Sequence, residues 1–261
     1  MRAIMIMYDS LNRRYLPPYG DTVSKMPNFS RLAQKTVVFD RFYAGSLPCI
    51  PARRELHTGR YNFLHRCWGP LEPFDDSMPK LLGEHGIYSH CVTDHAHYWQ
   101  EGGSTYHTKF SSCEMIRGQE GDFWIGNAKG FKKNLDLHRQ DKVNRTAMQG
   151  EEKHPHVKTF KAGMKFLEDN VDNDNWYLQL EYFDPHEPYF VPDTYKMLYT
   201  DKENDFDWPY YGEVSEGEKG RQEVFDARMN YRAVLSMIDH YLGKILDFMD
   251  SHEMWKDTML I

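Results

Sequence analysis

The run of residues 49–53, CIPAR, brings a cysteine, a proline and an arginine close together, and Thr58 and Gly59 follow it. Pro51 suits the first position of a helix and Gly59 the position just past its end, so the spacing predicts a short helix. Cys49 then lies at the helix N-terminus, where free backbone N–H groups favour negative charge. Arg53, one turn further on, can offer its guanidinium to the same anion, which predicts a site for sulfate or phosphate. A buried free cysteine before an ordinary surface helix is the simpler alternative.

Acidic residues and histidines also follow the predicted strands directly. They are Asp9 and Ser10 after strand 3–8, Asp94, His95 and His97 after strand 87–93, and Asp184 and His186 after strand 176–183. The Cys49 segment follows a fourth predicted strand, 36–43. Any one of these residues suits a solvated turn, but ligands of α/β sheets collect beyond the carboxyl ends of the strands. The pattern therefore predicts that the four segments converge on one pocket.

Strands and helices alternate along the chain. Helices are predicted at 26–34, 78–86 and 157–171, and a long apolar stripe predicts another at 231–249. Two irregular segments, 99–155 and 192–220, interrupt the pattern and are predicted to be surface insertions. The alternation predicts an α/β fold with a largely parallel central sheet and helices on both faces.

Composition narrows the classes of function. The chain has 261 residues and a formal net charge of −7, without a basic tract, which disfavours nucleic acid and membranes as partners. Four cysteines without a dense framework fit a reducing compartment. The N-terminus enters a short apolar stretch with no cleavage site, so a cytoplasmic location is expected, with an exported form that has lost its leader as the alternative.

On Cys49, Pro51, Arg53 and the Thr58-Gly59 pair, the chain resembles the sulfatase family of the alkaline phosphatase superfamily. The resemblance implies that Cys49 is oxidised after synthesis to formylglycine, so a formylglycine-generating or sulfatase-maturating enzyme is an expected partner. It also implies an alkaline-phosphatase-like fold and hydrolysis of sulfate esters of small molecules or glycans. One hydroxyl of the hydrated aldehyde would attack sulfur, and the other would then expel sulfate.

The same resemblance implies one divalent metal ion. Asp9 matches the family's aspartate that binds a metal, usually calcium, and Cys49 lies beside that ion in the family. Ser10 stands where many members have a second carboxylate, so it is the third expected metal residue. Oxygen ligands favour Ca²⁺, with Mg²⁺ or Mn²⁺ as alternatives, over zinc.

Substrate contacts are implied at two further segments. His97 resembles the histidine of the family's Gly-Lys-x-His segment, but Asp94 and His95 replace the glycine and lysine. This departure favours phosphonate monoester and phosphodiester hydrolases of the superfamily as the alternative function. Residues 185–189, PHEPY, match the family's Pro-His-x-Pro-Tyr element, which implies that His186 contacts or protonates the leaving oxygen. Arg53 would spread the charge of the sulfate oxygens.

Residues 257–261 begin another strand, after which the family carries further metal and substrate ligands. We therefore expect residues 1–261 to be the N-terminal part of a sulfatase catalytic domain that is inactive unless the rest is supplied. Two further hypotheses for the function remain. One is a homologue that binds sulfated ligands without cleaving them. The other is a hydrolase using the Cys49 thiolate, which requires Arg53 and the helix N-terminus to lower the thiol pKa.

Overall fold

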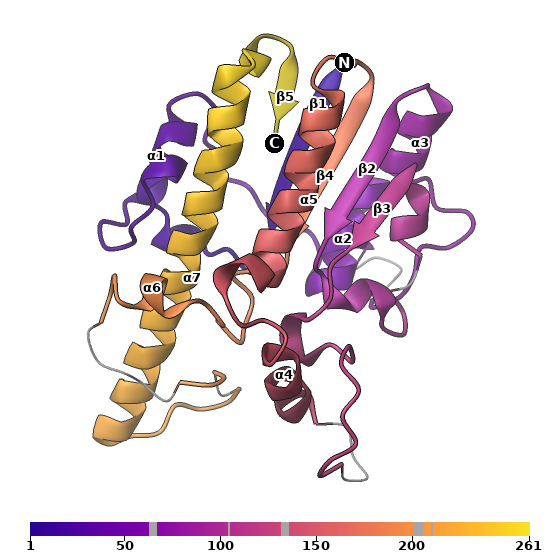
Figure 1. Ribbon diagram of the computed structural model, residues 1–261. Helices are drawn as coiled ribbons and strands as arrows, with labels where there is room; N and C mark the ends of the chain where they lie inside the picture. The colour runs from indigo at the N-terminus through magenta and orange to yellow at the C-terminus, as the bar shows by residue number, and fades with distance from the viewer. Residues whose placement is uncertain (63–66, 104, 132–135, 201–205, 210) are drawn as a thin grey trace.

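The computed structural model describes residues 1–62, 67–103, 105–131, 136–200, 206–209 and 211–261 (Figure 1). Its strands are β1 (Arg2–Tyr8), β2 (Tyr88–Thr93), β3 (Ser112–Met115), β4 (Trp176–Tyr182) and β5 (Thr258–Leu260). They form one sheet in the order β3-β2-β4-β1-β5, and every neighbouring pair is parallel. The carboxyl ends of all these strands therefore lie at one edge of the sheet.

Helices connect and cover the strands. The α-helices are α1 (Pro27–Ala33), α2 (Cys49–Thr58), α3 (Met78–Glu84), α4 (Leu137–Arg145), α5 (Pro155–Asn170), α6 (Asp193–Lys196) and α7 (Gly217–Ser251). Short 3₁₀ helices are η1 (Arg13–Tyr15), η2 (Pro17–Tyr19), η4 (Ala96–Trp99), η5 (His107–Lys109), η6 (Gln119–Gly121), η7 (Glu151–Lys153) and η8 (Met254–Lys256). In the part of the chain that is described, no helix has the long apolar run that crossing a bilayer requires.

Both faces of the sheet are buried because successive side chains of a strand point to opposite sides. Ile4 and Leu178 belong to the large core cluster that includes side chains of α5 and α7, and α5 lies over β4 and β1 in Figure 1. Ala3, Cys91 and Tyr177 point to the other face and pack beside α3. The predicted α/β architecture, with a parallel sheet between two helical layers, is confirmed.

One predicted strand is wrong. Residues 36–43 form no strand, and the side chains of Val37, Phe42 and Tyr43 are 77%, 81% and 82% exposed. The segment is rich in β-formers, but propensity alone does not make a strand where no neighbouring strand supplies hydrogen bonds. The Cys49 segment therefore does not follow a fourth strand of the sheet.

Regular structure also occurs where the sequence predicted irregular segments. The 99–155 segment contains β3 and α4, and the 192–220 segment contains α6 and the start of α7. Strand β3 is only four residues long, SCEM, so its alternation of polar and apolar residues is too short to be a clear signal. Residues 104, 132–135, 201–205 and 210 of these segments lie outside the described residues.

Helix α7 anchors the N-terminus of α1. Asp239 of α7 accepts hydrogen bonds from the backbone N–H of Asn28 (3.1 Å) and of Phe29 (2.8 Å). The N-cap residue of α1, Met26, makes no side-chain capping bond, so Asp239 satisfies these two orphan donors from another helix. The contact joins the first helix of the chain to the last.

We expect Asp239→Ala to lower the free energy of unfolding by about 1–2 kcal/mol, because it leaves two partly buried N–H groups unpaired. Asp247→Ala is the matched control on the same helix, since Asp247 is exposed and pairs with Arg31 at the surface, a contact worth less than about 1 kcal/mol. Urea unfolding of the two variants measures both effects. Equal losses would contradict the capping role of Asp239.

A second ionic contact predicts a pH dependence of stability. Burial raises the pKa of Asp21, but the hydrogen-bonded Arg232 guanidinium and the Ser24 backbone N–H outweigh this and lower the pKa to about 2. A lowered pKa stabilises the folded protein above the unfolded value of about 3.9. That contribution disappears as the pH falls toward about 2.

Asp21→Asn should therefore cost about 1 kcal/mol at pH 7, since solvent screens part of the charge interaction, and the difference in unfolding free energy from the wild type should narrow when the pH falls below about 4. Thermal or urea unfolding at pH 7 and pH 3 measures the gap at both values. A gap that stays constant between them would show that the Asp21 charge does not contribute.

Candidate active site

Three parallel strands deliver their polar residues to one place. Asp9 follows β1, and its backbone N–H donates to the Tyr182 carbonyl of β4 at 2.9 Å. The Asp94 N–H donates to the Glu181 carbonyl at 3.4 Å, so the ends of β2 and β4 are aligned in the same way. The residues after β1, β2 and β4 therefore meet at the carboxyl edge, as the sequence predicted.

Cys49, Asp9 and His95 form one group there. The cysteine sulfur, a carboxylate oxygen and an imidazole nitrogen all lie within 4.8 Å of one another. Cys49 is the first residue of α2, and Gly59 ends that helix in the left-handed conformation, with φ of 65°. Pro51 thus lies in the third helical position and not in the predicted first one. Its missing N–H still falls within the first turn, where no helical bond is lost.

Arg53 is buried between two carboxylates. Its Nη1 lies 2.7 Å from Asp9 Oδ2, and its Nε donates to Glu181 Oε1 at 2.8 Å. Nη1 also donates to the Cys49 carbonyl at 3.4 Å. Nη2 is buried without a hydrogen-bond partner among the described residues. The guanidinium thus lies beside position 49, with one nitrogen left to donate to a ligand.

Glu181 is a site residue that sequence reasoning missed. It is wholly buried in β4, within the strand sequence WYLQLEY. Tyr98 donates its hydroxyl to Glu181 at 2.8 Å, and Gln179 donates from Nε2 at 3.1 Å. The available signal was a glutamate two residues after a glutamine on one face of an apolar strand, because a buried charge requires a partner.

Charge and burial set the protonation states of this group. Burial raises the pKa of Asp9, but Arg53 and then His95, whose Nε2 is 3.3 Å from Asp9 Oδ2, lower it well below its usual range. Burial lowers the pKa of His95 to about 4, so its imidazole is neutral at pH 7. Burial, and then the Asp9 charge, raise the pKa of the Cys49 thiol to about 12. The thiolate hypothesis requires the opposite shift, so the structure argues against it.

A second group lies at the same edge. Ligand atoms of Glu120, His186 and Glu187 are within 4.8 Å of one another, and His97 Nε2 lies 3.4 Å from Glu120 Oε2. His186 Nδ1 lies 3.2 Å from Glu187 Oε2. Burial raises the pKa of Glu120 to about 7 and lowers that of His97. Glu120, in the irregular 99–155 segment, had no sequence signal.

Asp94 lies deeper in the protein than these groups. Its side chain is fully buried and accepts from the Phe183 N–H at 2.6 Å and from Gln119 Nε2 at 3.0 Å. Gln119 Nε2 also donates to Asp184 at 3.3 Å. Burial raises the pKa of both carboxyls, that of Asp94 to about 7. The structure gives Asp94 a supporting contact, and its role as a substrate ligand stays a prediction.

The residues at Asp9 fit a cation. Asp9 stays ionised, and both ring nitrogens of buried His95 lack a hydrogen-bond partner among the described residues. Ser10 is exposed and its hydroxyl donates to Asp9 Oδ1 at 3.0 Å. Carboxylate and hydroxyl oxygens suit Ca²⁺, Mg²⁺ or Mn²⁺, whereas imidazole and sulfur suit transition metals. The donor set fits a metal and leaves its identity open.

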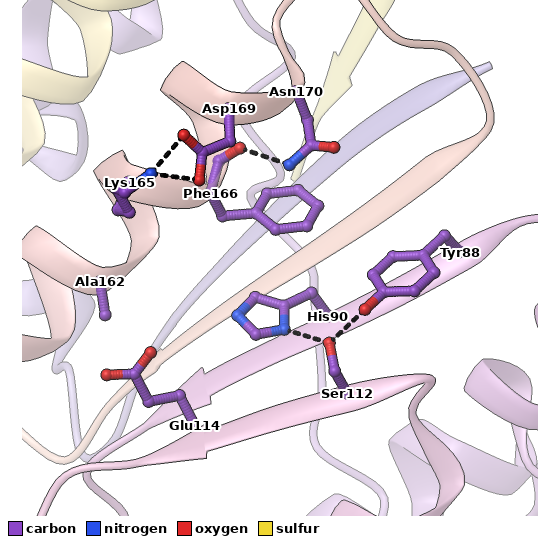
Figure 2. A pocket seen from close by; sticks show the side chains of 9 residues that line it. All are labelled: Tyr88, His90, Ser112, Glu114, Ala162, Lys165, Phe166, Asp169 and Asn170. Carbon is purple, nitrogen blue, oxygen red and sulfur yellow. Dashed lines mark hydrogen bonds and ion pairs between the residues drawn. The ribbon is translucent and has the colours of Figure 1, made fainter.

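A separate hollow of about 370 Å³ opens between α5 and the strands β2 and β3 (Figure 2). Figure 2 shows Tyr88, His90 and Ser112 on the side of the hollow that β2 and β3 form. The Tyr88 hydroxyl donates to Ser112 Oγ at 2.8 Å, and His90 Nδ1 lies 2.6 Å from the same oxygen. None of the predicted site residues lines this hollow. The convergent groups at the carboxyl edge therefore remain the candidate active site.

Known proteins share both sequence and fold with this chain. The sequence model of the family described as Sulfatase matches residues 2–261. A choline-sulfatase of Rhizobium meliloti (strain 1021) is 23% identical over 298 residues, which cover 99% of this chain and 56% of that protein. An ulvan-active sulfatase of Formosa agariphila is 38% identical over 47 residues, 18% of this chain and 8% of that protein. The chain thus spans little more than half the length of the choline-sulfatase.

Solved structures show the same fold. A phosphonate monoester hydrolase of Agrobacterium radiobacter has a TM-score of 0.68 and 18% identity, over 100% of this chain and 61% of that chain. The structure of BT4656 in complex with its substrate D-glucosamine-2-N,6-O-disulfate has a TM-score of 0.71 and 14% identity, over 99% and 64%. The architecture is therefore common to hydrolases of phosphonate and sulfate esters.

The raised pKa of Cys49 predicts slow alkylation of the unmodified thiol. At pH 8 we expect iodoacetamide to label exposed Cys67 at least about tenfold faster than Cys49, because only the thiolate reacts. Peptide mass spectrometry over time gives both rates. Equal rates at the two cysteines would contradict the environment described for Cys49.

Proposed function

Because this chain belongs to the sulfatase family, we propose that the protein hydrolyses sulfate esters with a formylglycine made from Cys49. The observation that carries the proposal is the placement of Cys49 beside Asp9 and Arg53 at the start of α2. A nucleophile for sulfate must lie where a cationic group can reach the sulfate oxygens, and the Arg53 guanidinium lies beside position 49.

Two groups that the family implies would supply chemistry here. Formylglycine at position 49 would provide, as its hydrate, a hydroxyl nucleophile and a second hydroxyl that allows release of sulfate. A divalent cation held by Asp9, with Ser10 and residue 49 beside it, would polarise the sulfate oxygens. The carboxylate and hydroxyl favour Ca²⁺, as the sequence predicted, with Mg²⁺ or Mn²⁺ as alternatives.

The protein's own residues orient the reactants. Arg53 has a buried Nη2 without a partner, which can donate to a sulfate oxygen next to position 49. The Arg53 charge is fixed in advance by Asp9 and Glu181, so no reorganisation is required when the anion binds. Burial of these groups keeps water away and strengthens each charge interaction.

His186 is the proposed proton donor to the leaving oxygen. Its Nδ1 is held by the Glu187 carboxylate and by the Glu187 carbonyl, both at 3.2 Å, which leaves Nε2 to face a substrate. His97 lies in the same group, and we assign it, with His95 and Asp94, to the substrate side of the site. A histidine oriented by a neighbouring carboxylate is a common acid catalyst.

The proposed substrates are sulfate esters of small molecules or glycans. The relatives support both classes, because one is named a choline-sulfatase and the solved BT4656 complex contains a disulfated glucosamine. A formylglycine-generating or sulfatase-maturating enzyme is the proposed partner that modifies Cys49. A homologue that binds sulfated ligands without cleavage is the non-enzymatic alternative.

Hydrolysis of phosphonate monoesters or phosphodiesters is the second candidate activity. Asp94 and His95 occupy the positions of the glycine and lysine in the family's Gly-Lys-x-His segment, which removes one positive charge from the substrate side. Parallel assays with aryl sulfate, phenylphosphonate and phosphodiester substrates separate the two activities. A larger kcat/KM for the phosphorus esters would favour the second.

The proposal predicts a mass change and a loss of activity at Cys49. In the full-length protein produced with a maturating enzyme, the Cys49 peptide should be lighter by about 18 Da than its cysteine form. Cys49→Ala should lower kcat/KM for sulfate esters by at least about 10³-fold. Cys67→Ala is the matched control and should retain activity, because Cys67 is exposed and belongs to neither of the two side-chain groups at the carboxyl edge. An active Cys49→Ala protein would exclude the formylglycine mechanism.

A further inference from the structure

We propose that Glu181 is a positioning residue, which holds the Arg53 guanidinium in the orientation that receives the sulfate group. The inference rests on the proposed function, since it names a residue that acts through Arg53. Glu181 itself touches no group at position 49 and is not a catalytic residue. By accepting from Nε, Glu181 leaves Nη2 as the Arg53 nitrogen that can donate to the anion.

The three nitrogens of the Arg53 guanidinium have different surroundings. Nε donates to Glu181 Oε1 at 2.8 Å, and Nη1 pairs with Asp9 Oδ2 at 2.7 Å. Nη2 is buried and has no hydrogen-bond partner among the described residues. With Nε and Nη1 both held, the planar group cannot rotate, and Nη2 is fixed in one direction.

Without the Glu181 charge, the Arg53 guanidinium could form a stronger ion pair with Asp9. A single carboxylate binds arginine best through two parallel N–H groups. Arg53 would then be drawn toward Asp9 with two nitrogens, so that Nη2 would no longer be kept free for the anion. The same movement would neutralise the carboxylate that is proposed to hold the metal. Glu181 thus keeps Arg53 from acting as a simple partner of Asp9.

Glu181 is itself held rigidly. It is wholly buried, and Tyr98 and Gln179 donate to its second oxygen at 2.8 and 3.1 Å. Tyr177 donates to Gln179 Oε1 at 2.9 Å, which continues the network along β4. Apart from Arg53, the donors to this carboxylate come from β4 and η4, so Glu181 is a fixed reference point for the α2 side chain.

A purely structural role for Glu181 makes different predictions. If Glu181 only stabilised the fold, its loss would lower stability and activity to the same extent whether or not Arg53 was present. If it positions Arg53, the effect on the anion requires Arg53. A double-mutant cycle between the two residues separates these roles.

The experiment uses the full-length, matured, metal-loaded protein, with the formylglycine fraction of every variant measured by mass spectrometry. The variants are Glu181→Gln, Arg53→Ala and the double variant. Tyr106→Phe is the matched control, because it removes a buried tyrosine hydroxyl that donates to the Gly69 carbonyl and not to Glu181. The readouts are kcat and KM for an aryl sulfate, and the Kd of inorganic sulfate by calorimetry.

We expect Glu181→Gln to weaken sulfate binding by about tenfold and to lower kcat/KM by about 10–100-fold. In the Arg53→Ala background the same change should have an effect of less than about threefold. Tyr106→Phe should stay within about threefold of the wild type. If Glu181→Gln does not fold, Glu181→Asp replaces it: the shorter acid keeps the charge, displaces Arg53, and should give the same non-additive loss.

Equal effects of Glu181→Gln with and without Arg53 would overturn the inference, as would wild-type sulfate binding in Glu181→Gln. If the wild-type protein hydrolyses no sulfate ester but binds sulfate, the proposed function fails, and the calorimetric cycle alone decides the role of Glu181. A wild-type protein that neither hydrolyses nor binds sulfate would overturn both.

Discussion

The buried ion pairs of Arg53 are the contacts on which the site depends. They join α2 to the end of β1 through Asp9 and to β4 through Glu181. A charge inside a protein is tolerated only if it is paired and hydrogen-bonded, so each member requires the others. The start of α2, and with it Cys49, is therefore fixed against the sheet by electrostatics as well as by packing.

This arrangement also explains why the cysteine suits modification better than direct use. Arg53 carries one positive charge and faces two carboxylates, which leaves a net negative charge next to the thiol. A thiolate would add a second negative charge in a buried place, and so the proton stays on sulfur. The proposed hydroxyl nucleophile at position 49 would be neutral and would avoid that conflict.

The fold itself does not decide the substrate. A parallel sheet with helices on both faces brings the β1, β2 and β4 loops to one edge, and that edge can serve sulfate or phosphorus esters. Discrimination must come from residues that line the edge, such as His97, Glu120 and Glu187. Two of these are carboxylates, so under the proposed function a charge on the alcohol part of the ester would affect binding at this edge.

Several features followed from local sequence. The CIPAR run, the polar residues after each strand and the helical stripe of α7 predicted the fold class and the group around Asp9 and Cys49. Local patterns suffice for Asp9 and for the residues after β2 and β4 because the ends of parallel strands must meet at one edge. Cys49 reaches that edge from α2, which does not follow a strand directly. Only the tertiary structure decided that residues 36–43 form no strand and that Glu181 holds Arg53. Strand pairing and partners of buried charges depend on residues far apart in the chain, 128 positions in the case of Arg53 and Glu181, and no local pattern encodes them.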